Sequence, residues 1–306
     1  FIDNKALSES TLAEIMKQGK DYGTGEDAGR IMVEFSSPNT NKPLHLGHLR
    51  NICLGEAMSR LQERRGKEVI RSCLVNDRGI HICKSMLAYK LFGKEEEPRK
   101  KTDHFVGDYY VLFNQKVKEN KELEDQAQEM LRSWEAGDKE TVALWKKMNA
   151  WALDGFEKTY DRLGISFDKY YYESEIYKKG KEIIEQGLKD GAFVKEDGAV
   201  TAKFDDKSLP DKVLIRSDGT SLYMTQDVYL AKLKFDEYEL EKSVYVVGNE
   251  QDLHFRQLFA ILDKLGFGFS ENCFHLSYGM VELPSGKMKS REGTVVDRSE
   301  EHTSEL

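Results

Sequence analysis

The fold is decided by residues 31–75, which have the sequence IMVEFSSPNTNKPLHLGHLRNICLGEAMSRLQERRGKEVIRSCLV. Residues 31–35 are apolar enough to predict a buried strand, and residues 68–75 predict a second one. Between them, apolar side chains recur every three to four positions over residues 45–65, which indicates a helix that Gly66 is suited to end. A strand, a helix and a strand within this length form a βαβ unit, which implies parallel strands joined by a right-handed crossover.

The same kind of alternation returns in the last third of the chain. A hairpin around Asp218-Gly219 is expected to resume the sheet from residue 213, and a helix to begin at residue 226. Further expected elements are a strand at 243–247, a helix at 254–265 and a strand at 273–277. The predicted fold class is therefore α/β, a doubly wound parallel sheet of the Rossmann-like, nucleotide-binding type.

The expected domain organisation has one catalytic unit with an insertion. We expect residues 1–30 to be a connector or the remnant of an N-terminal domain, and residues 31–297 to form the catalytic domain. A mainly helical insertion is expected at about 94–212, and its helices at about 105–163. Residues 298–306 resemble a translated sequencing adapter, so they are expected to be a non-native tail.

Composition sets limits on the kind of protein. The chain has 306 residues, of which 39% are hydrophobic and 33% are charged, typical of a folded domain with a sizeable core. The net charge of −8 does not favour a nucleic-acid binder, although a local basic stripe remains compatible with it. No apolar stretch is long enough to span a bilayer, which favours a cytoplasmic protein. The four cysteines form no C-x-x-C pair, so free thiols in a reducing compartment are expected; they are Cys53, Cys73, Cys83 and Cys273.

The residues that indicate chemistry most directly are His45, Gly47 and His48, in the order H-x-G-H. They lie between the first strand and its helix, at the carboxyl end of a parallel sheet, where ligands bind in such folds. A helix N-terminus offers unpaired N–H groups and a partial positive charge that suit phosphate. Glycine allows a nucleotide to approach the backbone, and the imidazoles can donate hydrogen bonds to phosphate oxygens even when neutral. A chance pair of surface histidines is the alternative.

A second candidate lies near the end of the chain, in the segment KMKSREG at residues 287–293. Lys287, Lys289 and Arg291 could close over a leaving pyrophosphate and neutralise charge that grows in the transition state. A solvated basic loop is the alternative for this segment taken alone.

The two motifs in this order resemble the paired signatures of class I aminoacyl-tRNA synthetases, and within that class the chain is most similar to arginyl-tRNA synthetase. The loop has K-M-K-S-R where the class pattern is K-M-S-K-S, so Ser290 stands at the position of the second lysine. The resemblance covers nearly the whole chain, and its other segments are VEFSSPN at 33–39, YMTQD at 223–227, EQDLH at 250–254 and residues 286–296.

The resemblance implies roles for particular residues. The guanidinium of arginine is planar, always charged and has five donors, so its pocket needs acidic acceptors. The family pattern places Glu34, Asp227 and the Tyr223 hydroxyl there. By themselves, Glu34 would also fit a capping or ion-pairing carboxylate, and Tyr223 would fit core packing. The resemblance also implies that the α-amino and carboxylate end of arginine contacts Ser37, Asn39 and Gln251. It implies that the ATP ribose contacts Gly248 and Glu250, and that the ATP phosphates contact His45, Gly47 and His48. The leaving pyrophosphate is implied to contact Lys287, Lys289 and Arg291.

The implied partners are L-arginine, ATP with Mg²⁺, and tRNA(Arg), and arginine activation is implied to depend on bound tRNA. No dedicated metal site is expected. We further expect a monomer and a truncated catalytic core that lacks the anticodon-binding domain.

Three other hypotheses remain open on sequence. The first is a class I synthetase for glutamine, glutamate or cysteine. The second is a small-molecule nucleotidyltransferase that shares H-x-G-H, and the third is an inactive fragment that binds a nucleotide or RNA.

Overall fold

The computed structural model describes residues 3–283 and 286–287. At its centre is a five-stranded sheet with strand order β3-β2-β1-β7-β8, in which every neighbouring pair is parallel. The strands are β1 (Arg30–Glu34), β2 (Glu68–Val75), β3 (Lys169–Tyr172), β7 (Lys242–Gly248) and β8 (Cys273–Tyr278). The α/β fold class is confirmed, and so are four predicted strands, each to within one residue at either end.

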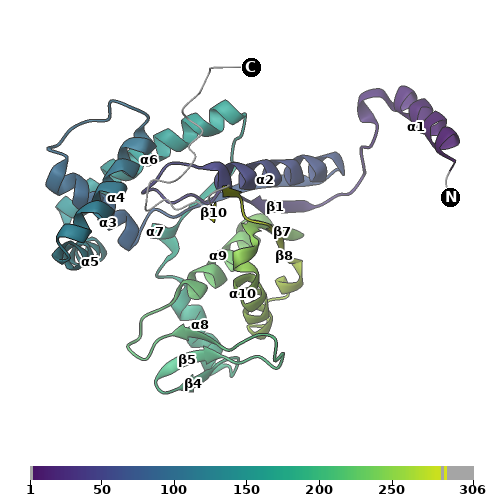
Figure 1. Cartoon of the computed structure of the whole chain (residues 1–306). Helices are drawn as coiled ribbons and strands as arrows, with labels where there is room; N and C mark the ends of the chain where they lie inside the picture. Colours follow the sequence, from purple (N-terminus) through teal and green to yellow (C-terminus); the bar gives the residue numbers. More distant parts are fainter. Residues whose placement is uncertain (1–2, 284–285, 288–306) are drawn as a thin grey trace.

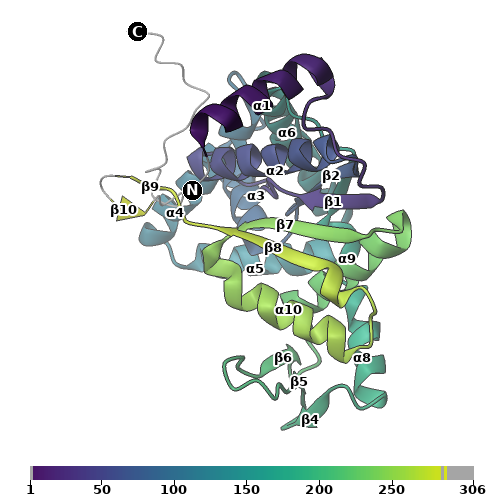
Figure 2. The ribbon, with the colours of Figure 1, turned by 90° about the vertical axis from the view of Figure 1, so that its right-hand side faces the viewer.

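Helices cover both faces of this sheet (Figures 1 and 2). On one face lie α2 (Leu46–Arg64) and α6 (Lys139–Leu163), and on the other α9 (Tyr223–Tyr238) and α10 (Asp252–Lys264). Successive β1 side chains point to opposite faces, so Ile31 and Val33 pack under α2 and α6 while Met32 packs with Leu230 of α9. A strand buried on both faces is apolar throughout, which explains the uninterrupted run in the sequence.

A close approach between α2 and β1 fixes the helix on the sheet. A Cβ added at Gly55 would lie 2.2 Å from the Phe35 ring, so only glycine lets the helix sit this near. Phe35 is completely buried and stands at the start of the loop that carries several candidate residues.

The expected helical insertion is present. It packs α4 (Thr102–Glu119) and α5 (Glu122–Glu135) with α6, and α3 (Ile80–Phe92), which precedes the predicted range, joins them around a core that includes Met86, Phe105 and Phe113. The indole Nε1 of Trp145 on α6 donates to the carbonyl of Asp77 at 2.6 Å, which links the insertion to the loop after β2.

One stretch inside the range 94–212 belongs to the central sheet instead. Strand β3 pairs in parallel with β2 and is followed directly by the short helix α7 (Glu173–Ile176). The chain therefore leaves the central sheet after β2, forms the helices, and returns to the edge of the sheet as β3.

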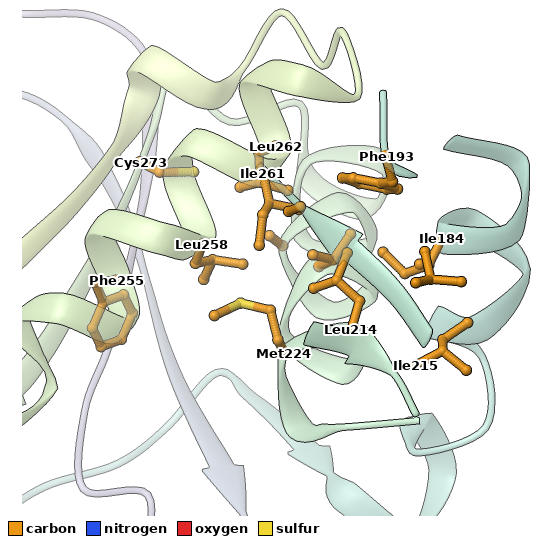
Figure 3. Packing of buried hydrophobic residues seen from close by; sticks show 14 of the residues in the cluster. Ile184, Phe193, Leu214, Ile215, Met224, Phe255, Leu258, Ile261, Leu262 and Cys273 are labelled. Atoms are coloured by element: carbon orange, nitrogen blue, oxygen red, sulfur yellow. The ribbon is translucent and has the colours of Figure 1, made fainter. Parts of the chain in front are cut away.

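A small antiparallel sheet forms a separate layer below α9 and α10 in Figure 1. Its strands are β4 (Val194–Glu196), β5 (Ala199–Ala202) and β6 (Lys212–Ile215), and α8 (Gly180–Lys189) packs beside them. Figure 3 shows the core they share with α9 and α10, where Ile184, Leu214 and Leu258 meet.

The prediction for residues 213–226 was wrong in two respects. Strand β6 pairs with β5, not with the central sheet, and the second arm of the expected hairpin is a single bridge between Ile215 and Ser221. The turn at Asp218 does form, because its carboxylate accepts from the Thr220 N–H at 2.8 Å. Helix α9 begins at Tyr223, three residues earlier than expected, since the chain leaves the turn directly into the helix.

The remaining elements lie at the periphery. Helix α1 (Asn4–Gln18) is capped by Asp3 and lies away from the other helices in Figure 1. The other short elements are η1 (Gly19–Asp21), η2 (Asn249–Gln251), η3 (Ser270–Asn272), β9 (Glu282–Leu283) and β10 (Gly286–Lys287). In the part of the chain that the structure describes, no helix is both long and apolar enough to cross a membrane.

Candidate active site

The strand order reverses between β1 and β7. The chain continues from β1 toward β2 and β3 on one side, and from β7 toward β8 on the other, so the order reverses between these neighbours. Loops leaving the carboxyl ends of the two strands diverge there, which is where open α/β sheets bind ligands. The loop after β1 carries Ser37, Asn39 and His45, and the segment after β7 carries Glu250 and Gln251.

The two histidines of H-x-G-H open helix α2 in a defined orientation. Nδ1 of His45 accepts from the N–H of Gly47, and Nδ1 of His48 accepts from the N–H of His45, both at 3.1 Å. Each neutral ring therefore has its proton on Nε2, and the ring centroids are 4.0 Å apart. Burial lowers the pKa of His48 well below its usual value, and the charges of His45 and Lys42 lower it further. His48 is thus a neutral donor at neutral pH.

The loop after β1 is held in an unusual backbone conformation. Ser36 and Ser37 both have positive φ, at 70° and 45°, in the left-handed region that non-glycine residues avoid. Asn51 of α2 holds this bend, since its Oδ1 accepts from the Ser36 N–H at 2.5 Å and its Nδ2 donates to the Val246 carbonyl at 2.6 Å. Asn51 therefore connects the β1 loop to β7.

A second asparagine holds the same loop from the β2 side. Nδ2 of Asn76 donates to the Ser37 carbonyl at 3.1 Å, and Asn76 forms a parallel bridge with Asn39. Ser37 and Asn39 are both partly exposed, so their side chains can reach a ligand.

Glu34, at the end of β1, is engaged by a residue that the sequence analysis did not single out. It is 5% exposed, and its Oε2 lies 2.7 Å from Nζ of Lys234 on α9. The ion-pairing alternative for Glu34 is thus what the structure contains. Its carboxylate nonetheless lies on the face of the sheet covered by α9, the helix that also carries Asp227.

Asp227 and Tyr223 come from the first two turns of α9. Asp227 is partly exposed, and its Oδ2 lies 2.7 Å from Nε2 of His254 on α10. Tyr223 is 69% exposed, which contradicts the core-packing alternative for it. His254 lies in the segment EQDLH, and no role was predicted for it from the sequence.

Glu34 and Asp227 lie close enough to act on one buried group. The pKa of Tyr245 on β7 is raised well above its usual value, foremost by burial, and the charges of Cys273, Glu34 and Asp227 raise it further. Glu34 contacts Lys234 of α9 and Asp227 belongs to the same helix, so both carboxylates lie on the α9 side of the sheet.

A third carboxylate lies nearby and was missed because it sits in the expected insertion. Glu173, at the start of α7, is 8% exposed. Burial raises its pKa to about 7; Arg78 opposes this shift, while the charges of Asp77 and Asp227 add to it. Helix α7 contacts α9, so Glu173 lies near the helix that carries Asp227.

The residues predicted to contact the ATP ribose and the arginine backbone groups, Gly248, Glu250 and Gln251, lie at the end of β7 and just after it. Gly248 ends β7 and is buried, and a Cβ there would lie 2.7 Å from Sδ of Met280, so a side chain would push the Met280 thioether aside. Glu250 and Gln251 follow in η2 and are exposed.

The expected cationic loop is described only at its start. Lys287 belongs to β10, whose backbone pairs with Glu282 of β9. Lys289 and Arg291 lie outside the described residues, as does the stretch 298–306. Among the described residues, no three His, Cys, Asp or Glu side chains cluster as a metal site would require.

Comparisons with known proteins agree with this geometry. Residues 11–300 match a family model described as tRNA synthetases class I (R), catalytic domain. The chain is 53% identical to an arginine–tRNA ligase of Treponema denticola, over 97% of this chain and 52% of that protein. It is also 53% identical to an arginine–tRNA ligase of Parabacteroides distasonis, over 89% of this chain and 49% of that protein. The chain thus spans about half the length of the curated relatives it matches.

Solved structures show the same fold at lower identity. An arginyl-tRNA synthetase of Thermus thermophilus superposes with a TM-score of 0.77 at 24% identity, covering 93% of this chain and 54% of that one. An arginyl-tRNA synthetase of Plasmodium falciparum gives 0.68 at 21% identity, covering 83% of this chain and 44% of that one.

Proposed function

Because the chain belongs to the family of class I tRNA synthetase catalytic domains for arginine, we propose that it activates L-arginine with ATP and supplies it to tRNA(Arg). The observation that carries this proposal is the histidine pair at the start of α2, next to the point where the strand order reverses. Two imidazole N–H donors at a helix N-terminus suit the phosphates of ATP.

The proposed arginine site lies over the carboxyl ends of β1 and β7. Asp227, Glu34 and the Tyr223 hydroxyl would accept from the guanidinium, since charge-assisted bonds to a planar cation are strong and directional. The side chains proposed for the α-amino and carboxylate groups are Ser37, Asn39 and Gln251. The left-handed bend at Ser36 and Ser37 supports this assignment, because a strained loop held by two asparagines is a rigid platform.

The proposed ATP site lies at the start of α2 and the end of β7. Nε2 of His45 and of His48 would donate to phosphate oxygens, Gly47 would allow close approach, and Gly248 and Glu250 would hold the ribose. Lys287, Lys289 and Arg291 are proposed to stabilise the leaving pyrophosphate. Mg²⁺ would enter with the triphosphate and be held by phosphate oxygens, where it adds positive charge.

In the proposed reaction, an oxygen of the arginine carboxylate attacks the α-phosphorus of ATP and the bond to pyrophosphate breaks. The products are arginyl-adenylate and pyrophosphate. A hydroxyl of the terminal tRNA ribose then attacks the arginyl carbonyl and releases AMP. The side chains contribute positioning and electrostatic stabilisation, without a covalent nucleophile. We further propose that the protein works as a cytoplasmic monomer.

The test is arginine-dependent exchange of labelled pyrophosphate into ATP, with and without tRNA(Arg). We expect exchange that requires arginine and is not supported by lysine. His45→Ala serves as the matched control and should reduce exchange by about 100-fold, because removing one donor to a transition-state charge costs about that much. Absence of exchange in the wild-type chain, with tRNA present and arginine saturating, would contradict the proposal and favour an inactive binding fragment.

A further inference from the structure

Lys234 is a buried cation for which the proposed reaction gives no role. It is 0% exposed, on the inner side of α9, and its Nζ lies 2.7 Å from Oε2 of Glu34. The same Nζ lies 4.2 Å from the centre of the Tyr245 ring. A lysine without water around it is costly, so it is retained only with a compensating partner. Glu34 is that partner.

The pairing occupies only one oxygen of the Glu34 carboxylate. Within residues 3–283 and 286–287, the Glu34 carboxylate makes one ion pair, through Oε2, and neither Oε2 nor the Lys234 Nζ makes a hydrogen bond. A carboxylate has room for several hydrogen bonds, so this pair leaves acceptor capacity on Glu34 unused.

The spacing on α9 connects this ion pair to the proposed arginine site. Tyr223, Asp227 and Lys234 are separated by four and seven residues, so they lie along one side of the helix. The stripe runs from an exposed tyrosine at the helix start, through a partly exposed aspartate, to a fully buried lysine. Glu34 approaches this stripe from the end of β1 at its buried end.

We propose that Lys234 is a positioning residue of the arginine site, which holds Oε2 of Glu34 and thereby orients the carboxylate for the ligand guanidinium. This inference rests on the proposed function. Two carboxylates, Glu34 and Asp227, would then face two cations, the internal ammonium and the guanidinium, so the filled site is balanced in charge. A neutral ligand of the same shape would leave part of the negative charge of the two carboxylates without a cation, so it would bind poorly.

The experiment compares L-arginine with L-citrulline, which has a neutral ureido group in place of the guanidinium. Affinities are measured by titration calorimetry on the full 306-residue chain and on variants Lys234→Met and Lys234→Arg. We expect Lys234→Met to reduce the preference for arginine over citrulline by at least about tenfold, because the buried Glu34 carboxylate loses the cation that holds it in place. Lys234→Arg keeps the charge and should restore most of the preference. A purely structural role would weaken both ligands equally.

The double variant Glu34→Gln/Lys234→Met guards against misfolding of the single variant, because it removes both buried charges and keeps the side-chain lengths. It should bind citrulline as the wild type does and lose the preference for arginine. An unchanged preference in either Met-containing variant overturns the role of Lys234. A wild-type chain that does not distinguish the two ligands overturns the arginine site itself, which is a separate result.

Discussion

Nε2 of His254 lies 2.7 Å from Oδ2 of Asp227, and this contact joins α10 to α9 beside the carboxyl edge of the central sheet. Both side chains are about one quarter exposed. The imidazole therefore holds one carboxylate oxygen of Asp227. Lys234 holds one oxygen of Glu34 in the same way, so each of the two acidic side chains proposed to accept from the guanidinium is oriented by a basic side chain from a helix.

The first prediction concerns Asp227. Replacement by Asn should weaken arginine binding by roughly 1.5–3 kcal/mol, about 10- to 150-fold in Kd, because a hydrogen bond to a charged acceptor is lost. Calorimetric titration with arginine measures it. Asp236→Asn is the matched control: this residue is on the same helix but in an exposed ion pair with Lys232, and arginine affinity should not change. Equal affinity in both variants would remove Asp227 from the site.

The second prediction concerns pH and His48. Its pKa is lowered in the folded chain, so the unfolded chain binds more protons below the ordinary value of 6.5. The contribution of the neutral ring to stability is therefore complete above pH 6.5 and is lost as the pH falls toward the lower folded pKa. Urea unfolding at pH 7.5 and pH 5.5 should show a smaller loss on acidification for His48→Gln than for the wild type. If the free energy of unfolding changed equally with pH in the two proteins, the lowered pKa of His48 would be contradicted.

Much of the fold could be predicted from the sequence because its signals are local. The run at residues 31–35 is apolar since both faces of β1 are covered, and the histidine motif follows it within the same βαβ unit. The small sheet could not be recognised, because β6 has an apolar pattern like that of a central strand and only its partner β5 reveals its place. Lys234 and His254 were missed for a related reason: their partners Glu34 and Asp227 are 200 and 27 residues away in sequence, and only folding brings them together.

The third prediction concerns Glu173. Burial raises its pKa from 4.5 to about 7, so the protonated form is favoured in the folded chain. The associated stability is complete below pH 4.5 and is lost as the pH rises through about 7, by an amount on the order of 3 kcal/mol. Glu173→Gln is neutral at every pH and should not show this loss. Urea unfolding of both proteins between pH 5 and pH 8 measures this loss of stability. If the free energy of unfolding had the same pH dependence in the wild type and the variant, the raised pKa would be refuted.

The fourth prediction concerns the contact between α2 and β1. Gly55→Ala should destabilise the chain by about 1–3 kcal/mol, because the new Cβ would stand 2.2 Å from the completely buried Phe35 ring and one of the two elements must shift. The better helix propensity of alanine, about 1 kcal/mol, opposes this loss but does not cancel it. Gly268→Ala is the control, since a Cβ there meets nothing within 4 Å.

The same substitution should also affect the site, because Phe35 directly precedes the strained Ser36 and Ser37. A shift of its ring moves the bend that Asn51 holds, so arginine affinity should fall together with stability, whereas in Gly268→Ala both should stay near the wild-type values. Urea unfolding and arginine titration on the two variants measure the two effects. A Gly55→Ala chain as stable as the Gly268→Ala chain would show that α2 can move away from β1 without cost, and the rigid platform proposed for the β1 loop would then have no support.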